Sequence, residues 1–304
     1  MNLISVEDIT KTYENHIALS GLNLSINSGE IFGLLGPNGA GKTSLIRIIT
    51  RISAPDSGKV LWKGEDFKDE HIKNIGYLPE ERGLYKKMKV GEQALYFARL
   101  KGLSKIDAKT KLKFWFDKFE ISAWWNRKVE ELSKGMQQKV QFIITVLHEP
   151  ELLIFDEPFS GFDPVNRNLI KNEISEFKKR GASVIFSTHN MSSVEEICDR
   201  AALINNSKKI LDASISEIRK QYSSGIFEIN FDGFVNKFQA SLNVNYKILS
   251  IEENQGITTM RLNLNSEVES NKIIEDMLQF GRVISFKELI PTLDEIFIKL
   301  VKKD

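Results

Sequence analysis

The clearest pattern near the N-terminus is an alternation of apolar and polar residues, followed by a mostly apolar run. Leu22, Leu24 and Ile26 alternate with polar neighbours, which predicts a half-buried strand. Residues 30–35 are mostly apolar, and such a run predicts a strand that is buried on both faces. Apolar residues at helical spacing within residues 44–51 predict that a helix follows this second strand.

The middle of the chain changes from helices back to strands. Between residues 90 and 127 the apolar spacing is helical, and we interpret this part as a helical insertion. Strands are predicted again at residues 152–155 and 182–187, the second of them after a helix over about residues 166–180. The order strand, helix, strand implies a largely parallel sheet, so the first domain is predicted to be of the α/β class.

The C-terminal part has a different character. Phe227, Ile229 and Phe231 alternate with polar residues, which predicts a strand. Residues 266–269 are interpreted as a capping box that opens a helix closed by Gly281, and residues 292–295 as a second capping box. We therefore predict a first domain over residues 1–222, with its helical part at about 88–148. A small α+β domain is predicted over residues 223–304.

A glycine-rich segment lies between the predicted buried strand and its helix. It reads Gly-Pro-Asn-Gly-Ala-Gly-Lys-Thr over residues 36–43 and matches the phosphate-binding P-loop in full. Its glycines allow backbone N–H groups to point at phosphate oxygens, and the following helix adds the positive end of its dipole. Lys42 supplies charge to the β and γ phosphates, and Thr43 offers a hydroxyl to Mg²⁺. The residues that we expect to bind nucleotide here are Gly36, Pro37, Asn38, Gly39, Ala40, Gly41, Lys42, Thr43 and Ser44.

Two carboxylates end the strand predicted at residues 152–155. Asp156 fits the acid that holds Mg²⁺ in P-loop ATPases. Glu157 follows it directly and is expected to polarise the attacking water as a general base. Two acids after a strand are a weak signal alone, and the P-loop makes the pair a strong one.

Residues 132–138 read Leu-Ser-Lys-Gly-Met-Gln-Gln and precede a helical run. Here the chain resembles the ATPase subunits of ABC transporters, whose signature sequence reads LSGGQ; Lys134 and Met136 depart from it. The resemblance implies a P-loop NTPase fold with a mixed sheet, an antiparallel β subdomain and a helical subdomain. It also implies a head-to-tail homodimer that holds two ATP molecules at its interface. Ser133 and Gly135 are then expected to contact the γ-phosphate bound by the opposite subunit.

Other positions follow from the same resemblance. It implies that Tyr13 stacks on adenine, that Asp163 in residues 160–164 faces across the dimer, and that His189 contacts the γ-phosphate. Glu80 stands where most relatives carry a glutamine. We hypothesise that Glu80 is a metal ligand that also reports the nucleotide state to a membrane subunit.

The resemblance covers about residues 1–213, and the tail adds a branch. Residues 79–85 and 291–297 resemble the Nat-type sodium-export branch, which works with separately encoded ABC-2-type membrane subunits. The resemblance therefore implies ATP-driven export through a permease on another chain, with this chain in the cytoplasm at the inner face of the cell membrane. Three alternatives stay open: a soluble ABC ATPase without a transport role, a nucleotide-gated regulatory module, and an importer ATPase.

Composition limits the function further. With 42 basic and 41 acidic residues the chain has a formal charge of +1, so no nucleic-acid partner is expected. The N-terminus lacks the pattern of a signal peptide, and no apolar run approaches the roughly 18 to 20 residues that cross a bilayer. The single cysteine, Cys198, is expected to be a small buried residue.

Overall fold

The computed structural model describes residues 1–302, except for positions 82, 160, 242–245, 255 and 265–269. The chain divides into two compact units, Met1–Ile215 and Ser216–Asp304. The boundary between the two units therefore follows Ile215, upstream of the boundary predicted after residue 222.

The first unit contains an antiparallel sheet with the strand order β2-β1-β4-β5. Its strands are β1 (Asn2–Tyr13), β2 (His16–Asn27), β4 (Ser57–Trp62) and β5 (Glu65–Asp66). The alternation that predicted a strand is confirmed in β2, where Leu22, Leu24 and Ile26 are buried. These side chains join one hydrophobic cluster with residues of the neighbouring parallel sheet, such as Phe32 and Ile154.

The second sheet of this unit has the order β10-β9-β3-β8-β7-β6. All neighbouring pairs are parallel except β9 and β10, which are antiparallel. Every residue of β3, β7 and β8 is buried, as the apolar runs predicted. Because these three strands are parallel neighbours, their carboxyl ends meet at one edge of the sheet. The strands are β3 (Ile31–Leu35), β6 (Ile75–Leu78), β7 (Leu152–Asp156), β8 (Ser183–Ser187), β9 (Arg200–Asn205) and β10 (Lys208–Ser214).

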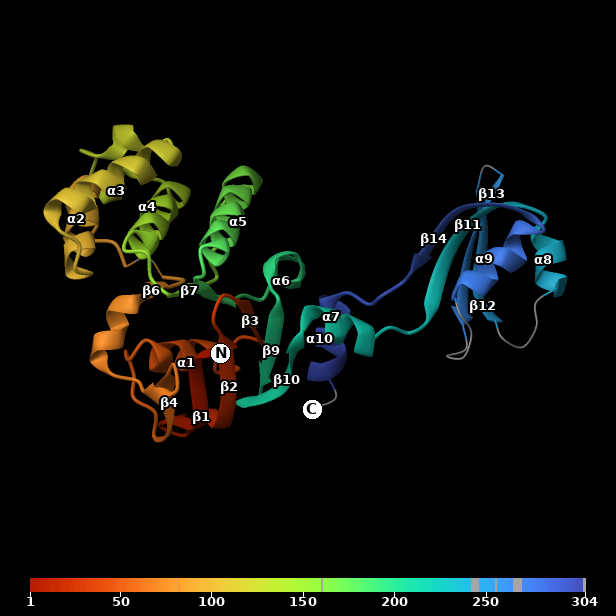
Figure 1. Ribbon diagram of the computed structural model, residues 1–304, viewed down its shortest axis with the longest axis horizontal. Helices are drawn as coiled ribbons and strands as arrows, with labels where there is room; N and C mark the ends of the chain where they lie inside the picture. The colour runs from red at the N-terminus through yellow and green to blue at the C-terminus, as the bar shows by residue number, and fades with distance from the viewer. Residues whose placement is uncertain (82, 160, 242–245, 255, 265–269, 303–304) are drawn as a thin grey trace. The chain divides into compact units, whose positions relative to one another are not determined.

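The helices of the first unit include a separate group, α2, α3 and α4, which is visible in Figure 1. An aromatic cluster holds this group to the sheet and to α5, because Phe142 stacks on Phe155 and Trp115 stacks on Phe177. The helices are α1 (Lys42–Ile49), α2 (Val90–Leu100), α3 (Lys105–Lys118), α4 (Lys134–Val146), α5 (Pro164–Lys179) and α6 (Met191–Ile197). Two short 3₁₀ segments, Ser122–Trp124 and Val129–Glu131, lie between α3 and α4, and a third, Asp69–Asn74, lies between β5 and β6.

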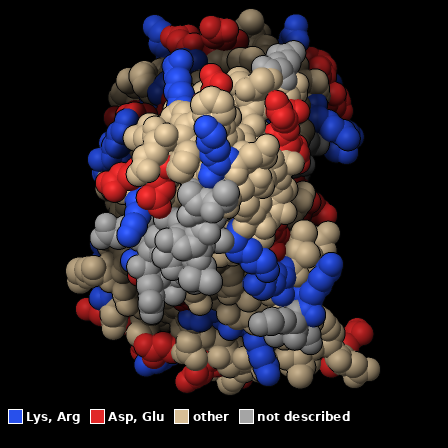
Figure 2. Space-filling model, turned by 90° about the vertical axis from the view of Figure 1, so that its right-hand side faces the viewer, with Lys and Arg blue, Asp and Glu red and all other residues tan. Residues whose placement is uncertain are grey.

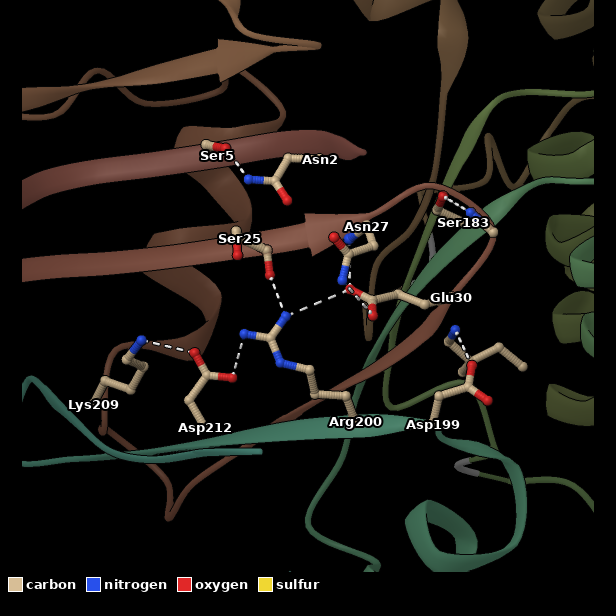
Figure 3. Close-up of polar contacts among 12 residues, drawn as sticks. Asn2, Ser5, Ser25, Asn27, Glu30, Ser183, Asp199, Arg200, Lys209 and Asp212 are labelled. Carbon is tan, nitrogen blue, oxygen red and sulfur yellow. Dashed lines mark hydrogen bonds and ion pairs between the residues drawn. The ribbon is translucent and has the colours of Figure 1, made fainter. Parts of the chain in front are cut away.

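A charged network ties β2, β9 and β10 to Glu30, the residue before β3 (Figure 3). The Arg200 guanidinium donates to the Ser25 carbonyl at 3.0 Å and lies 2.6 Å from an Asp212 oxygen. Glu30 lies 3.7 Å from the same guanidinium. Arg200 therefore joins the antiparallel sheet to the parallel sheet at the end opposite the strand carboxyl termini.

The second unit is an antiparallel sheet with the order β12-β13-β11-β14. Its elements follow each other as β-α-β-β-α-β, the ferredoxin-like arrangement. The alternation that predicted β11 buries Phe227, Ile229 and Phe231 in a core of their own with residues such as Met260. Acidic and basic side chains are interspersed over the face drawn in Figure 2. The elements are α7 (Ile215–Gln221), β11 (Ile226–Gly233), α8 (Val235–Ser241), β12 (Tyr246–Asn254), β13 (Ile257–Leu264), α9 (Ser270–Leu278), β14 (Gly281–Glu288) and α10 (Leu293–Val301).

The helix boundaries predicted in the C-terminal part have mixed outcomes. The capping box at residues 292–295 is confirmed, since Thr292 accepts from the Glu295 backbone N–H and Glu295 accepts from that of Thr292. The capping box predicted at residues 266–269 lies outside the described residues. The role predicted for Gly281 is wrong: α9 ends at Leu278, and Gly281 opens β14 opposite Gly233. A Cβ at Gly281 would lie 2.4 Å from the Asp232 carbonyl oxygen, so strand contact explains this glycine.

Within the described residues, no helix combines the length and apolarity that crossing a membrane requires. Cys198 is buried, as expected.

Candidate functional site

The loop between β3 and α1 adopts a conformation that only glycine permits at its key positions. Gly41 has φ +112°, and a Cβ there would lie 2.3 Å from the Ala18 carbonyl oxygen. The Lys42 ammonium donates to the carbonyls of Gly36 and Pro37, at 2.7 and 3.1 Å. Burial lowers the pKa of Lys42, while Glu157, Asp156 and Glu80 act in the opposite direction. The loop therefore places a cation beside a group of acids.

A cavity of about 440 Å³ opens in front of this loop. It brings together residues from β1, the loop and α1, the segment after β6, and the ends of β7 and β8. The predicted residues that line it are Tyr13, Asn38, Gly39, Gly41, Lys42, Thr43, Ser44, Glu80, Asp156, Glu157 and His189. Its size lies within the range of small-molecule sites.

The acids at the end of β7 have different surroundings. Asp156 is 4% exposed, and burial raises its pKa, with the Glu80 and Glu157 carboxylates adding to the effect. Glu157 has φ +49°, an uncommon conformation for a residue with a side chain. Its carboxylate accepts from the Thr188 hydroxyl at 3.0 Å and from the His189 backbone N–H at 2.8 Å. The Glu157 side chain is thereby held at the carboxyl end of the sheet.

His189 and Glu157 form a pair across two neighbouring strand ends. The His189 Nδ1 lies 2.7 Å from a Glu157 oxygen, so it donates to that carboxylate. The His189 side chain is 75% exposed, whereas that of Glu157 is 15% exposed. The histidine therefore covers the acid on the open side of the cavity.

Three oxygen donors of the cavity suit a divalent cation. Thr43, Glu80 and Asp156 all line it, and a hydroxyl with carboxylates is a donor set that fits Mg²⁺. Among the described residues, no group of three or more His, Cys, Asp or Glu side chains is placed to hold a metal. Mg²⁺ usually binds through one or two carboxylates together with phosphate oxygens rather than in an all-protein cage. The residues present therefore fit an ion that is held by both the protein and the phosphates of a nucleotide.

Gly36, Pro37 and Ala40 belong to the loop before α1 but do not line the cavity. Three other predicted residues, Ser133, Gly135 and Asp163, lie elsewhere in the unit. Ser133 is the N-cap of α4 and accepts from the Met136 backbone N–H at 3.3 Å. A Cβ at Gly135 would lie 3.6 Å from the Gly161 carbonyl oxygen, so the start of α4 adjoins Gly161. Gln138 of the same helix donates to the Pro158 carbonyl at 3.3 Å. These contacts connect the start of α4 to the segment that follows Glu157.

Asp163 lies in this second group as the N-cap of α5. It accepts from the Asn166 backbone N–H at 2.9 Å, and the bonds to Asn166 lower the pKa of this carboxyl. Ser160, which belongs to the same predicted segment, lies outside the described residues. Neither Ser133, Gly135 nor Asp163 is among the residues that line the nucleotide-sized cavity. The predicted site is thus divided between two surfaces of one chain.

Three residues at the site were not predicted. His16 and Ala18 of β2 line the cavity, and His16 is the strand partner of Tyr13. Thr188 bonds Glu157. Their position in the sequence could have indicated them, since each lies within five residues of a predicted residue along the chain.

Two protein-family models match the chain. One, described as "ABC transporter", matches residues 19–160. The other, described as "ATP-binding protein DrrA1-3-like, C-terminal domain", matches residues 214–301. The second match covers all but the last three residues of the predicted α+β domain.

Curated relatives resemble the chain over most or all of its length. An uncharacterized ABC transporter ATP-binding protein of Bacillus subtilis is 40% identical, over 98% of each chain. The ABC transporter ATP-binding protein NatA of the same organism is 31% identical over 71% of this chain and 91% of its own. The Nod factor export ATP-binding protein I of Rhizobium etli is 34% identical over 70% and 68%. These relatives confirm the predicted family and its Nat-type branch.

The solved structures confirm the predicted fold of the first unit. An ATP-binding subunit of an ABC transporter aligns with a TM-score of 0.68 and 29% identity, over 72% of this chain and 93% of that one. The α/β core with its antiparallel and helical parts is therefore an ABC ATPase fold.

Proposed function

The chain belongs to the ABC transporter ATP-binding proteins, and on that basis we propose that it drives export through a separately encoded membrane subunit. As a member of this family it is an ATPase. Export is supported by the relative that is named for Nod factor export. The proposed partners are an integral membrane permease and a second copy of this chain, with the chain bound at the inner face of the membrane.

The observation that carries the dimeric mechanism is the division of the site. Lys42, Asp156, Glu157 and His189 surround one cavity, whereas Ser133 and its neighbours lie on a different surface. Two copies arranged head to tail would place the second surface of one over the cavity of the other. Each ATP would then be enclosed by both protomers, and hydrolysis would require the dimer.

Within one protomer, the P-loop is proposed to bind the phosphates and Tyr13 to stack on the adenine. Tyr13 is 40% exposed and lines the cavity, so its ring is available for stacking. Lys42 would exchange its bonds to the Gly36 and Pro37 carbonyls for phosphate oxygens. Because burial disfavours its charge, we expect a bound anion to stabilise the charged ammonium.

Glu157 is the proposed general base and His189 the residue that positions it. The Glu157 carboxylate, held by Thr188 and His189, would accept a proton from the attacking water. The hydrogen bond from His189 Nδ1 leaves Nε2 directed to other partners, and we propose that it faces the γ-phosphate. Thr43, Asp156 and Glu80 would hold Mg²⁺, which supplies charge neutralisation for the phosphates when it is bound.

The test compares wild type with Glu157→Gln, each measured for ATP hydrolysis and sized by light scattering with MgATP. We expect wild-type activity to rise more than linearly with protein concentration, and Glu157→Gln to be inactive but dimeric with ATP. Glu92→Gln, an exposed acid of α2, is the control and should behave as wild type.

Activity of Glu157→Gln at the wild-type rate would refute the role of Glu157. Wild-type activity that stays proportional to protein concentration, with no ATP-dependent dimer, would refute the two-copy mechanism. Coupling to transport is tested separately: co-purification with a candidate membrane subunit should change the ATPase rate.

A further inference from the structure

Two charged residues depart from the family pattern, and they have opposite signs. Glu80 stands at a position where most relatives carry a neutral glutamine, and Lys134 stands in the signature where LSGGQ has a glycine. Both side chains are exposed. Among the described residues, neither makes a hydrogen bond or an ion pair.

The nucleotide cavity has an excess of negative charge before any nucleotide binds. Its lining contains the carboxylates of Glu80, Asp156 and Glu157 and a single lysine, Lys42. The Glu80 carboxylate acts to raise the pKa of both Lys42 and Asp156, although burial has the larger effect on each. ATP adds further negative charge, so the extra carboxylate at position 80 opposes nucleotide binding unless a cation compensates for it.

Among the described residues, which leave out position 82, the same protomer supplies few cations near Glu80. Arg47 of α1 lies in an adjoining cavity, but it shares that cavity with both Glu80 and Glu81. The cation of the cavity itself, Lys42, already faces three acids. Apart from the Mg²⁺ that Glu80 would hold with Thr43 and Asp156, further balancing charge is then expected from the protomer that closes over the cavity.

The surface that we propose to close over the cavity carries such a charge. In residues 132–138 the only charged side chain is Lys134, the first residue of α4. It lies next to Ser133 and Gly135, the residues proposed to reach the γ-phosphate of the other protomer. We propose that Lys134 of one protomer enters the nucleotide site of the other and balances Glu80 there. This inference rests on the head-to-tail dimer of the proposed function and adds to it a residue that departs from the LSGGQ pattern.

A double-mutant cycle tests the pairing of Lys134 with Glu80. All proteins carry Glu157→Gln, so that ATP-bound dimers accumulate, and the MgATP concentration that gives half-maximal dimer is measured by light scattering. Lys134→Gly should raise this concentration about tenfold, because it removes the charge that Glu80 needs once the dimer encloses it. Combining it with Glu80→Gln should restore the concentration to within about threefold of the parent, because coupled sites are not additive. Lys134→Arg should retain the parent behaviour, and the loss in Lys134→Gly should shrink at high salt.

The chain offers a matched control for the glycine substitution. Lys105 is the first residue of α3 and follows the N-cap Ser104, just as Lys134 follows the N-cap Ser133. Lys105→Gly therefore carries the same local cost to a helix start, and it should change the half-maximal concentration by less than about twofold. Thermal unfolding of each variant confirms that it is folded.

The outcomes separate this inference from the proposed function. If Glu157→Gln dimerises with MgATP but Lys134→Gly has equal effects with and without Glu80→Gln, the pairing is refuted and the dimeric mechanism stands. An effect of Lys134→Gly no larger than that of Lys105→Gly also refutes the pairing. If the Glu157→Gln protein stays monomeric at every MgATP concentration, the dimeric mechanism is refuted and this inference with it.

Discussion

His148 makes the stability of the first unit depend on pH. It follows α4, and its Nε2 donates to the Ile75 carbonyl at 3.3 Å. Its Nδ1 is buried and has no hydrogen-bond partner in the described part of the chain. Burial lowers the pKa of His148 from 6.5 to about 4, and the nearby Lys101 ammonium contributes in the same direction. The folded protein therefore holds this imidazole neutral.

The sign of the effect follows from the two pKa values. The unfolded chain binds a proton at this imidazole near pH 6.5, and the folded chain only near pH 4. Stability from the neutral imidazole is thus fully present above pH 6.5 and is lost as the pH falls towards 4. One pKa unit corresponds to about 1.4 kcal/mol, so the full loss is about 3 kcal/mol. About 2 kcal/mol of it falls between pH 7 and pH 5.

Urea unfolding of wild type and His148→Gln at pH 7 and pH 5 measures this loss. Tryptophan fluorescence is a suitable probe, since all 4 tryptophans lie within Met1–Ile215. The stability of wild type relative to His148→Gln should fall by about 2 kcal/mol from pH 7 to pH 5. His16→Gln, which removes an exposed histidine, should leave the pH dependence of wild type unchanged. A difference between wild type and His148→Gln that stays constant within about 0.5 kcal/mol would refute the reasoning.

Two further predictions concern packing and charge in the first unit, both measured as the free energy of unfolding in urea. Gly91→Ala should destabilise by about 2 kcal/mol, because its Cβ would lie 2.3 Å from the Trp125 ring. Gly83→Ala, where a Cβ meets open space, should change stability by less than about 0.5 kcal/mol, and equal effects would contradict the steric account. Arg200→Met should cost about 2 kcal/mol, because it leaves the largely buried Asp212 without this partner and removes the bond to Ser25 (Figure 3). Lys179→Met, which breaks an exposed pair with Glu176, should cost less than about 0.5 kcal/mol, and a comparable loss would contradict the role of burial.

Several features of the chain are determined by short stretches of its sequence. The P-loop at residues 36–43 is one, since its glycines allow one backbone path and its lysine lies at a set distance along the chain. The buried strands β3, β7 and β8 are another, because continuous apolar runs must be covered on both faces. Thr292 and Glu295 cap α10 through bonds that span only three residues. In each case the deciding interactions lie within one element, so the local pattern suffices.

Gly281, whose role was predicted wrongly, shows what a local sequence pattern cannot reveal. Gly281 follows a helix, which suggested a helix cap. Its actual requirement comes from β11, a strand that lies far from it in sequence and whose Asp232 carbonyl leaves no room for a Cβ. A contact of this kind leaves no trace in the residues that adjoin the glycine.

The tertiary structure decided how distant groups meet. The sheet order β10-β9-β3-β8-β7-β6 brings Glu157 against His189, which lies 32 residues further along the chain. The same packing buries His148 beside Lys101. The fold also separates Ser133 from the cavity that Lys42 lines, and this separation supports the proposal of a two-copy site. The sequence by itself determined which chemical groups the protein carries and the elements that hold them. Their distances and burial depend on contacts between segments far apart in the chain, so only the folded structure decided them.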